Sequence, residues 1–180
     1  MQFIIFDLEA TCWEGNLMDR RQEIIEIGAI RLDEYGKEQD AFQRFVKPAR
    51  HPSLSVYCRK LTGIRQQDID AAPGFKRVGT LFKEWIEVSD DEYTLCSWGS
   101  KDKVLLTQDC QDAGIDTDWL EPFLDIKAQY HQLKGLSRKL GLKKCLMREG
   151  IEFDGMHHRA LDDAKNLREL FVRYFDMWAQ

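Results

Sequence analysis

An apolar run that ends in two acidic residues, close to the N-terminus, constrains the fold more than any other feature of the sequence. Residues 3–6 are Phe-Ile-Ile-Phe, and Asp7 and Glu9 follow with one residue between them. Four consecutive apolar residues predict a strand that is buried on both faces of a sheet. Side chains two positions apart on a strand point to the same side, so both carboxylates are expected to lie together near the strand's end.

Two carboxylates buried side by side need a compensating positive charge, because each disfavours the ionised form of the other. A divalent cation is the simplest compensation, since carboxylate oxygens are the hard ligands that Mg²⁺ and Mn²⁺ prefer. An isolated Asp-x-Glu pair is more often a strand that runs into an acidic turn. The rest of the chain has to decide between these two interpretations.

The composition predicts one globular domain over residues 1–180. Hydrophobic residues make up 43% of the chain and charged residues 32%, which is ordinary for a globular protein. No apolar run approaches the ~18 residues of a membrane span, and the N-terminus lacks the basic flank and cleavage site of a signal peptide. Five scattered cysteines without a Cys-x-x-Cys pair argue against a disulfide framework or a zinc knuckle and indicate reduced thiols in a cytoplasmic protein.

The net charge of −5 disfavours indiscriminate binding to nucleic acid, but the charges are unevenly distributed. Basic residues gather at 20–21, 47–65 and 134–144. A locally positive rim around an acidic pocket that holds metal could still bind a phosphodiester. The overall charge therefore decides neither for nor against a nucleic-acid partner.

Hydrophobic periodicity predicts an antiparallel ribbon followed by alternating helices and strands. Together with the first strand, residues 22–32 and 41–46 are expected to form three antiparallel strands, joined at 34–37 by a turn. This order predicts an α/β fold with a mixed sheet flanked by helices. The remaining expected elements are helices at 53–61, 75–86, 101–113, 135–142 and 160–178 and strands at 93–97 and within 120–126.

Further acids stand where two of the expected helices begin. Asp102 follows the strand at 93–97, and Asp162 and Asp163 open the last helix. Helix N-termini favour negative charge, so these carboxylates should stay ionised and able to bind a metal. Aspartate is common in a first helical turn for the same reason, and Asp102 taken alone indicates no more than that.

Helix geometry separates the two neighbouring aspartates. At ~100° per residue, Asp163 falls within the apolar stripe of the last helix, beside Leu170 and Tyr174. The stripe must face the sheet, so Asp163 is expected to point inward, where an acid needs a partner. Asp162 points away from the stripe and is expected to be solvated.

A histidine pair precedes these aspartates. His158 lies five residues before Asp163, and if both were helical their side chains would diverge. His158 is therefore expected on the incoming loop, turned toward the same pocket, and His157 is expected on the surface.

Together these residues predict a reaction. Asp7, Glu9, Asp102 and Asp163 supply four carboxylates, which two divalent ions would neutralise. Two ions at ~3.5–4 Å stabilise the attacking and leaving oxygens of an in-line phosphoryl displacement. His158, with an ordinary pKa of ~6.5, can take a proton from an attacking water near neutral pH. The predicted chemistry is metal-dependent hydrolysis of a phosphodiester.

The order of these motifs resembles that of a known family. Asp7-x-Glu9-x-Thr11, then Asp102, then His158-x-Ala160-x-x-Asp163 is similar to the signature of the DEDDh 3′-to-5′ exonucleases. The resemblance covers nearly the whole chain and implies an RNase H-like fold, with a mixed five-stranded sheet in which a three-stranded antiparallel ribbon continues into parallel strands, flanked by helices. Four shorter runs, at 9–12, 14–16, 23–26 and 61–64, resemble the Eri1/KapD-like subgroup, which contains RNA-trimming enzymes.

The resemblance also implies roles for individual residues. Asp7, Glu9 and Asp163 would hold a first Mg²⁺ or Mn²⁺, Asp102 with Asp7 would support a second, and His158 would be the general base. The implied substrate is a single-stranded nucleic acid with a free 3′ end, RNA in preference to DNA, from which nucleoside 5′-monophosphates are released.

Substrate contacts follow from the same resemblance. Tyr57 and Leu61 are i, i+4 neighbours on the helix expected at 53–61 and resemble the pair that packs on a terminal base. On periodicity alone they could equally be the buried side of a small helix. Ala10 and Thr11 resemble residues whose backbone and hydroxyl meet the sugar. Relatives often carry an aromatic residue before the second-motif aspartate, and Lys101 stands there instead.

Two other functions compete with this one. A haloacid-dehalogenase-type phosphatase also places acids after a buried strand, in an Asp-x-Asp-x-Thr pattern. However, it uses aspartate where Glu9 stands and a lysine motif instead of His158. An inactive, nuclease-like RNA-binding adaptor is the second alternative. Such proteins usually lack one or more catalytic acids, whereas all four are present here. The sequence predicts no oligomeric state and no role for Trp13 or Trp98.

Overall fold

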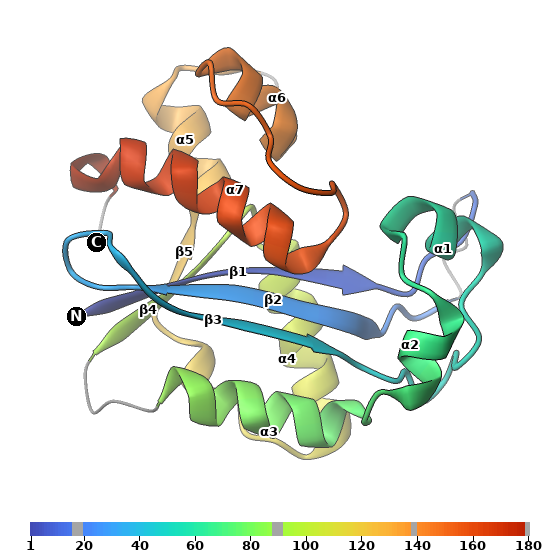
Figure 1. The fold of residues 1–180 in the computed structure, drawn as a ribbon. Coiled ribbons are helices and arrows are strands. Elements are labelled where there is room, and N and C mark those ends of the chain that lie inside the picture. Colours follow the sequence, from blue (N-terminus) through green and yellow to red (C-terminus); the bar gives the residue numbers. More distant parts are fainter. Residues whose placement is uncertain (16–19, 88–91, 138–139, 179–180) are drawn as a thin grey trace.

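The computed structural model describes residues 1–15, 20–87, 92–137 and 140–178. Its centre is a five-stranded mixed sheet in the order β3-β2-β1-β4-β5 (Figure 1). The first three strands are antiparallel, and β4 and β5 run parallel to β1, which confirms the predicted sheet. The strands are β1 (Gln2–Ala10), β2 (Ile24–Leu32), β3 (Glu38–Phe45), β4 (Tyr93–Ser97) and β5 (Phe123–Asp125).

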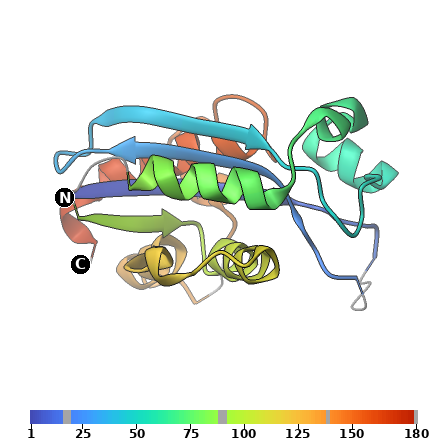
Figure 2. The same ribbon diagram turned by 90° about the horizontal axis from the view of Figure 1, so that it is seen from below.

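Helices cover both faces of this sheet. Helices α3 and α4 lie on one face, and α5, α6 and α7 lie on the other (Figure 1). Helices α1 and α2 stand beyond the end of the sheet where β1 finishes (Figures 1 and 2). The helices are α1 (Val56–Thr62), α2 (Gln66–Ala71), α3 (Phe75–Ile86), α4 (Lys101–Ala113), α5 (Ile126–Leu133), α6 (Leu142–Arg148) and α7 (Ala160–Arg173), with 3₁₀ turns at Asp118–Leu120 and Phe175–Met177.

The predicted double burial of β1 is confirmed. Ile4 and Phe6 pack in the core beneath α3 and α4, whereas Phe3 and Ile5 pack in the core beneath α5, α6 and α7. All four side chains are at most 4% exposed. Each apolar residue of this strand therefore contributes to one of two cores, which holds β1 at the centre of the molecule.

Several predicted boundaries were wrong. Helix α1 begins at Val56 rather than at residue 53, because the hydroxyl of Ser55 accepts a hydrogen bond from the Cys58 N–H and caps it there. The last helix ends at Arg173, and β3 begins earlier, at Glu38.

The helix expected at 135–142 is also wrong, although residues 138–139 lie outside the described part of the chain. Gly135 has a left-handed φ of 60° in a turn, and α6 begins only at Leu142. Helices α2 and α5 were not predicted. They have six and eight residues, which is too short for periodicity to single out.

Two further observations bear on the sequence-based expectations. No helix in the described ranges combines the length and apolarity that crossing a bilayer requires. All five cysteines are free thiols; four are buried, and Cys12 is half-buried.

Candidate active site

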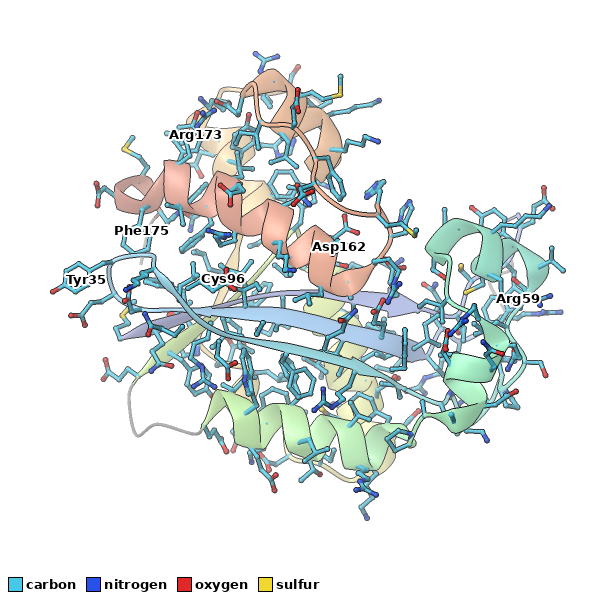
Figure 3. The ribbon with its side chains drawn as sticks, in the orientation of Figure 1. Tyr35, Arg59, Cys96, Asp162, Arg173 and Phe175 are labelled. Carbon is cyan, nitrogen blue, oxygen red and sulfur yellow. The ribbon has the colours of Figure 1, made fainter. Side chains whose placement is uncertain are left out.

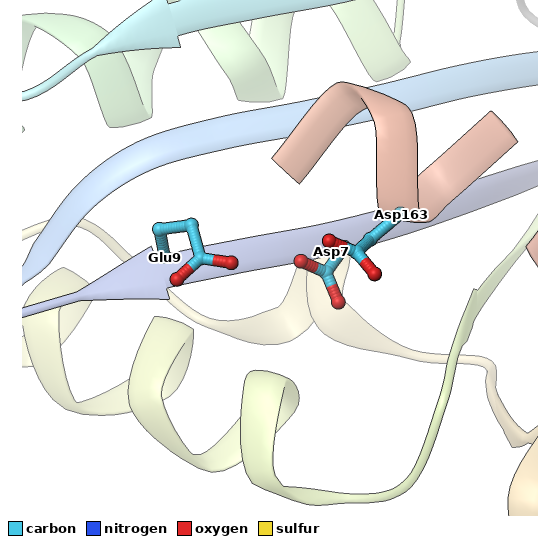
Figure 4. Close-up of side chains that lie close together, drawn as sticks. All are labelled: Asp7, Glu9 and Asp163. Atoms are coloured by element: carbon cyan, nitrogen blue, oxygen red, sulfur yellow. The ribbon is translucent and has the colours of Figure 1, made fainter. Parts of the chain in front are cut away.

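Three carboxylates meet at the C-terminal half of β1. Asp7 and Glu9 project from the same side of the strand, and Asp163 reaches them from the first turn of α7 (Figure 4). One oxygen of each carboxylate lies within 4.8 Å of the others, and Asp163 is only 5% exposed. The predicted inward orientation of Asp163 is therefore confirmed. Asp162, expected to be solvated, is half-buried and accepts a hydrogen bond from the Met156 N–H (Figure 3).

A glycine in β2 allows α7 to approach the sheet this closely. Gly28 lies opposite Asp7 in the β1–β2 register. A Cβ atom at Gly28 would lie 2.1 Å from the backbone nitrogen of Leu161 and 2.3 Å from the carbonyl carbon of Ala160. Only a residue without a side chain fits under this helix, so Gly28 positions Asp163 beside Asp7.

A buried ion pair fixes the start of the same helix. Glu26 lies opposite Glu9 in the register and is fully buried. The guanidinium of Arg159 donates to its carboxylate over 2.9 and 3.1 Å, and Gln43 and the Ala160 N–H add bonds of 2.7 and 3.2 Å. This Glu26–Arg159 pair connects β2 to the residue between His158 and α7, so it positions both the histidine loop and Asp163.

The acidic group is electrostatically uncompensated. Burial, together with the charges of Asp163, Glu26 and Asp102, raises the pKa of Glu9 to about 8. Burial and the charge of Asp102 raise the pKa of Asp7 well above its ordinary value. Burial also raises the pKa of Asp163, although a bond to His157 opposes this effect. Buried carboxylates that repel one another and offer only oxygen donors fit a divalent cation.

Asp102 lies in the same cleft as these carboxylates but outside the group of three. It sits in the first turn of α4 and lines the cleft beside Asp7. Burial raises its pKa to about 7, although the adjacent Lys101 opposes this shift. Its charge also contributes to the raised pKa values of Asp7 and Glu9. Asp102 therefore interacts electrostatically with the other carboxylates of the cleft.

Both histidines lie at this site. The backbone N–H of His158 donates to Asp163 over 2.8 Å, and its ring Nδ1 is 3.9 Å from a Glu9 oxygen. His158 adopts a left-handed φ of 67°, which turns its ring into the cleft. Burial and the charge of His157 lower the pKa of His158, so its ring is neutral near pH 7.

His157 has a partly exposed side chain, as expected for a surface residue, but it also contacts the acidic group. Its side chain is 37% exposed, and its Nδ1 lies 2.9 Å from an oxygen of Asp163. The His157 and His158 rings stack with centroids 4.0 Å apart. Residue spacing could not reveal this contact, because it depends on the left-handed turn at His158.

The carboxylates lie on the floor of a cleft of about 860 Å³. An apolar part of its wall comes from the end of β1, the residues just after it and α1, and consists of Ala10, Cys12 and Leu61. A basic part carries four lysines, which come from α4, α5 and α6: Lys101, Lys127, Lys143 and Lys144. The cleft therefore combines an apolar part and a basic part around its acidic floor.

The proposed substrate contacts divide into two groups. Ala10 and Leu61 line the cleft, whereas Tyr57 and Thr11 do not. Tyr57 is 41% exposed on α1. Thr11 is 2% exposed, and its hydroxyl accepts a hydrogen bond from the Glu23 N–H, so its side chain stabilises the β1–β2 connection instead of facing the cleft.

Sequence reasoning missed three positioning residues. Gly28 could have been found, because an isolated glycine inside an isoleucine-rich strand signals a close backbone approach. Glu26 and Arg159 are 133 residues apart, and no local pattern joins them. Of the two tryptophans left without a role, Trp98 lines the cleft, and Trp13 packs against the His51 ring at 4.8 Å.

Comparisons with known proteins agree with this geometry. The exonuclease family model RNase_T matches residues 4–171. Human "ERI1 exoribonuclease 2" is 33% identical over 91% of this chain, and rat "3′-5′ exoribonuclease 1" is 32% identical over 94% of it. The chain spans only 27% and 51% of the lengths of these two relatives.

A solved structure is similar over almost the entire fold. The nuclease domain of 3′hExo, described as a DEDDh family member bound to rAMP, superposes with a TM-score of 0.91 at 31% identity. The match covers 97% of this chain and 92% of that one. It also excludes the haloacid-dehalogenase-type alternative. By sequence, by fold and by the order of its acidic motifs, the chain belongs to the DEDDh family of 3′-to-5′ exonucleases, with similarity to the Eri1 exoribonucleases.

Proposed function

We propose that the chain is a metal-dependent exonuclease domain that hydrolyses single-stranded RNA from its 3′ end and releases nucleoside 5′-monophosphates. The convergence of Asp7, Glu9 and Asp163 on one point of the cleft floor, with His158 beside them, carries this proposal. Family membership supports the reaction class. The relatives' names, which specify exoribonucleases, support RNA as the substrate.

The acidic residues would hold the metal. Asp7, Glu9 and Asp163 are close enough to share one Mg²⁺ or Mn²⁺, and Asp102 with Asp7 would hold a second. Two such cations, when bound, supply Lewis acidity for the attacking and leaving oxygens of the phosphodiester. The four carboxylates match the charge of two divalent ions, which also relieves the repulsion that raises their pKa values.

His158 would act on the attacking water. Its ring is neutral near pH 7 because its pKa is lowered, so it can accept a proton. The bond from its backbone N–H to Asp163 fixes the residue beside the acidic floor. His157 Nδ1 lies 2.9 Å from an oxygen of Asp163, and a carboxylate oxygen keeps a second lone pair for a cation. His157 would therefore orient Asp163 for metal binding.

The apolar wall would receive the terminal nucleotide. Leu61 and Ala10 present a flat, uncharged surface next to Glu9, and nucleic-acid bases pack on such surfaces irrespective of their identity. A terminal base packed on this surface would place the last phosphodiester near the acidic floor, so cleavage is expected at a chain end and not within the chain.

The test uses single-stranded RNA and DNA labelled at the 5′ end, incubated with Mg²⁺, Mn²⁺ or EDTA. We expect a ladder of products that shortens from the 3′ end, faster on RNA, and no reaction in EDTA. A 3′-blocked strand and a circular strand should resist.

Cleavage of the circle would show an endonuclease and overturn the proposal. Binding without any metal-dependent cleavage would instead support the adaptor alternative. A cytoplasmic location, the absence of a membrane partner and a single domain over residues 1–180 stay predictions.

A further inference from the structure

One wall of the cleft carries four lysines that the proposed chemistry does not use. We call Lys101, Lys127, Lys143 and Lys144 the lysine wall. Lys101 opens α4, Lys127 is in the first turn of α5, and Lys143 and Lys144 are in the first turn of α6. Three helices that are separate in the sequence therefore contribute cations to the lining of one cleft.

The lysine wall has no acidic partners of its own. Within the described ranges, none of its members forms an ion pair. Lys83 and Lys103, outside the cleft, pair with Asp116 and Glu121, whereas Lys37 and Lys76 in the described ranges form no ion pair. The lysine wall is therefore distinguished by the gathering of four such cations at one cleft. Grouping unpaired cations raises the free energy of the fold through mutual repulsion, so an anion that binds among them is favoured.

The carboxylates of the acidic floor are not the anion that compensates the lysine wall. The charge of Lys101 influences Asp102, and that of Lys143 influences His158, so the wall is close to the floor. Under the proposed function, on which this inference rests, divalent cations neutralise the four carboxylates. The lysine wall then remains as about four uncompensated positive charges beside a neutral floor.

The apolar part of the cleft suits the other component of a strand. Ala10, Cys12 and Leu61 carry no charge and suit bases, whereas phosphates need cations. A single-stranded nucleic acid presents both apolar bases and charged phosphates, and the lining of the cleft offers groups for each. A small anion would need only one or two of the lysines, whereas a polyphosphate backbone can meet all of them.

We propose that the lysine wall is a binding subsite for the backbone phosphates upstream of the scissile bond. It takes any single-stranded nucleic acid irrespective of base sequence, because its contacts are to phosphate alone. It therefore contributes to affinity for a strand and leaves the hydrolysis of the terminal phosphodiester unchanged.

The test compares two double variants that remove the same charge. K143Q/K144Q alters the exposed lysines of α6, and K37Q/K76Q is the matched control. Lys37 and Lys76 are also exposed, in the β2–β3 turn and on α3, outside the cleft. Tyr35, in the same turn as Lys37, lies at the opposite end of the sheet from α1 (Figure 3). Circular dichroism and thermal unfolding verify that both variants fold.

Two substrates separate strand binding from chemistry. A fluorescein-labelled RNA of about 12 nucleotides reports Kd by anisotropy in Ca²⁺ across a salt series, and a dinucleotide, which has only the scissile phosphate, reports kcat/KM in Mg²⁺. For K143Q/K144Q we expect Kd for the long RNA to rise roughly tenfold and its log–log salt slope to fall by about 1.4, near 0.7 per lost contact. Dinucleotide hydrolysis should stay within about twofold, as should every value for K37Q/K76Q.

Three other results would decide whether the lysine wall binds backbone phosphates. Equal Kd and equal salt slopes for the two double variants would overturn the lysine wall, even if the wild type digests RNA. Equal losses on dinucleotide and long RNA would also overturn it, because the lysines would then act on chemistry or folding. In the third result, the wild type binds the long RNA with a steeper salt slope than K143Q/K144Q and yet hydrolyses neither substrate. That result would refute the proposed nuclease activity and leave the lysine wall supported.

Discussion

Two glutamates with largely shielded side chains have opposite electrostatic properties. The side chains of Glu9 and Glu149 are each 11% exposed. Burial and neighbouring acids raise the pKa of Glu9 to about 8. Burial would also raise the pKa of Glu149, but hydrogen bonds from Tyr130, Tyr174 and Lys134 lower it to about 2. At equal side-chain exposure, burial raises both pKa values, and only Glu149 has hydrogen-bond donors that reverse the shift.

The partners also indicate what each residue is for. Tyr130 and Tyr174 donate to Glu149 over 2.6 and 2.5 Å, and Lys134 lies 3.2 Å away, so this carboxylate is fully satisfied and joins α5, α6 and α7. Glu9 faces other acids, and its nearest potential cation, His158, is 3.9 Å away. The first site is complete as folded, whereas the second needs a cation from solution.

The strongest test of this contrast removes one acid from the floor. Asp7→Asn and Asp163→Asn should each lower RNA hydrolysis by at least roughly 10³-fold, because each takes away a proposed metal ligand. Both variants should also raise the melting temperature of the metal-free protein, since they relieve like-charge repulsion. Digestion of end-labelled RNA and thermal unfolding in EDTA measure the two effects. Near-normal turnover would contradict the assignment of ligands.

The histidines offer the next test. His158→Ala should slow hydrolysis by roughly 10²–10⁴-fold and remove the loss of activity below pH 6.5 that protonation of the base causes. His157→Ala should lower turnover by less than about tenfold, because that ring contacts a proposed metal ligand and not the water. Rate–pH profiles of both variants on RNA measure this. If His157→Ala lowered turnover more than His158→Ala, His157 would be the general base and His158 would not.

A third test removes the cation that pairs with Glu26, so that Glu26 becomes a buried carboxylate without a positive partner, as Glu9 is. Arg159→Met leaves a fully buried Glu26 without its cation, and removing one partner of a buried pair costs about 3–5 kcal/mol. Arg168 is the matched control, because it pairs at the surface with Glu38 and Glu169 and its loss should cost at most about 1 kcal/mol. Denaturant unfolding of both variants measures the difference. Equal destabilisation would mean that Glu26 finds other partners.

A further effect is expected on the pH dependence of stability, with opposite signs at the two sites. The pKa of Glu9 is raised from 4.5 to about 8 and that of Asp102 from 3.8 to about 7. Their protonation stabilises the metal-free fold below the ordinary values, and this contribution is lost as pH rises through about 7 to 8. Melting temperatures in EDTA should therefore fall from pH 5 to pH 8, and Mg²⁺ should restore them at pH 8. A melting temperature that does not change between pH 5 and pH 8 in EDTA would show that the carboxylates of the floor do not repel one another.

Glu149 supplies the control for that measurement. Its pKa is lowered from 4.5 to about 2, so its contribution is present above 4.5 and is lost as pH falls through about 2. Glu149→Gln should flatten the acid side of the profile and leave the EDTA-dependent fall between pH 5 and pH 8 unchanged. If the alkaline fall disappeared as well, the two sites would be coupled.

The sequence by itself determined those features that depend on neighbours along the chain. The apolar run at 3–6 predicted a doubly buried strand, the spacing of Asp7 and Glu9 placed both carboxylates on one side, and helical periodicity distinguished Asp163 from Asp162. These inferences succeeded because strand and helix periods are local properties of the backbone.

Only the tertiary structure decided the rest. The left-handed turn at His158 brought His157 to Asp163, Gly28 set how closely α7 meets the sheet, and Arg159 reached Glu26 across 133 positions. The lysine wall likewise comes from three helices, of which α5 was not predicted and α6 was predicted at the wrong residues. These contacts depend on how elements pack against one another, and no periodic pattern in the chain records which distant residues will meet.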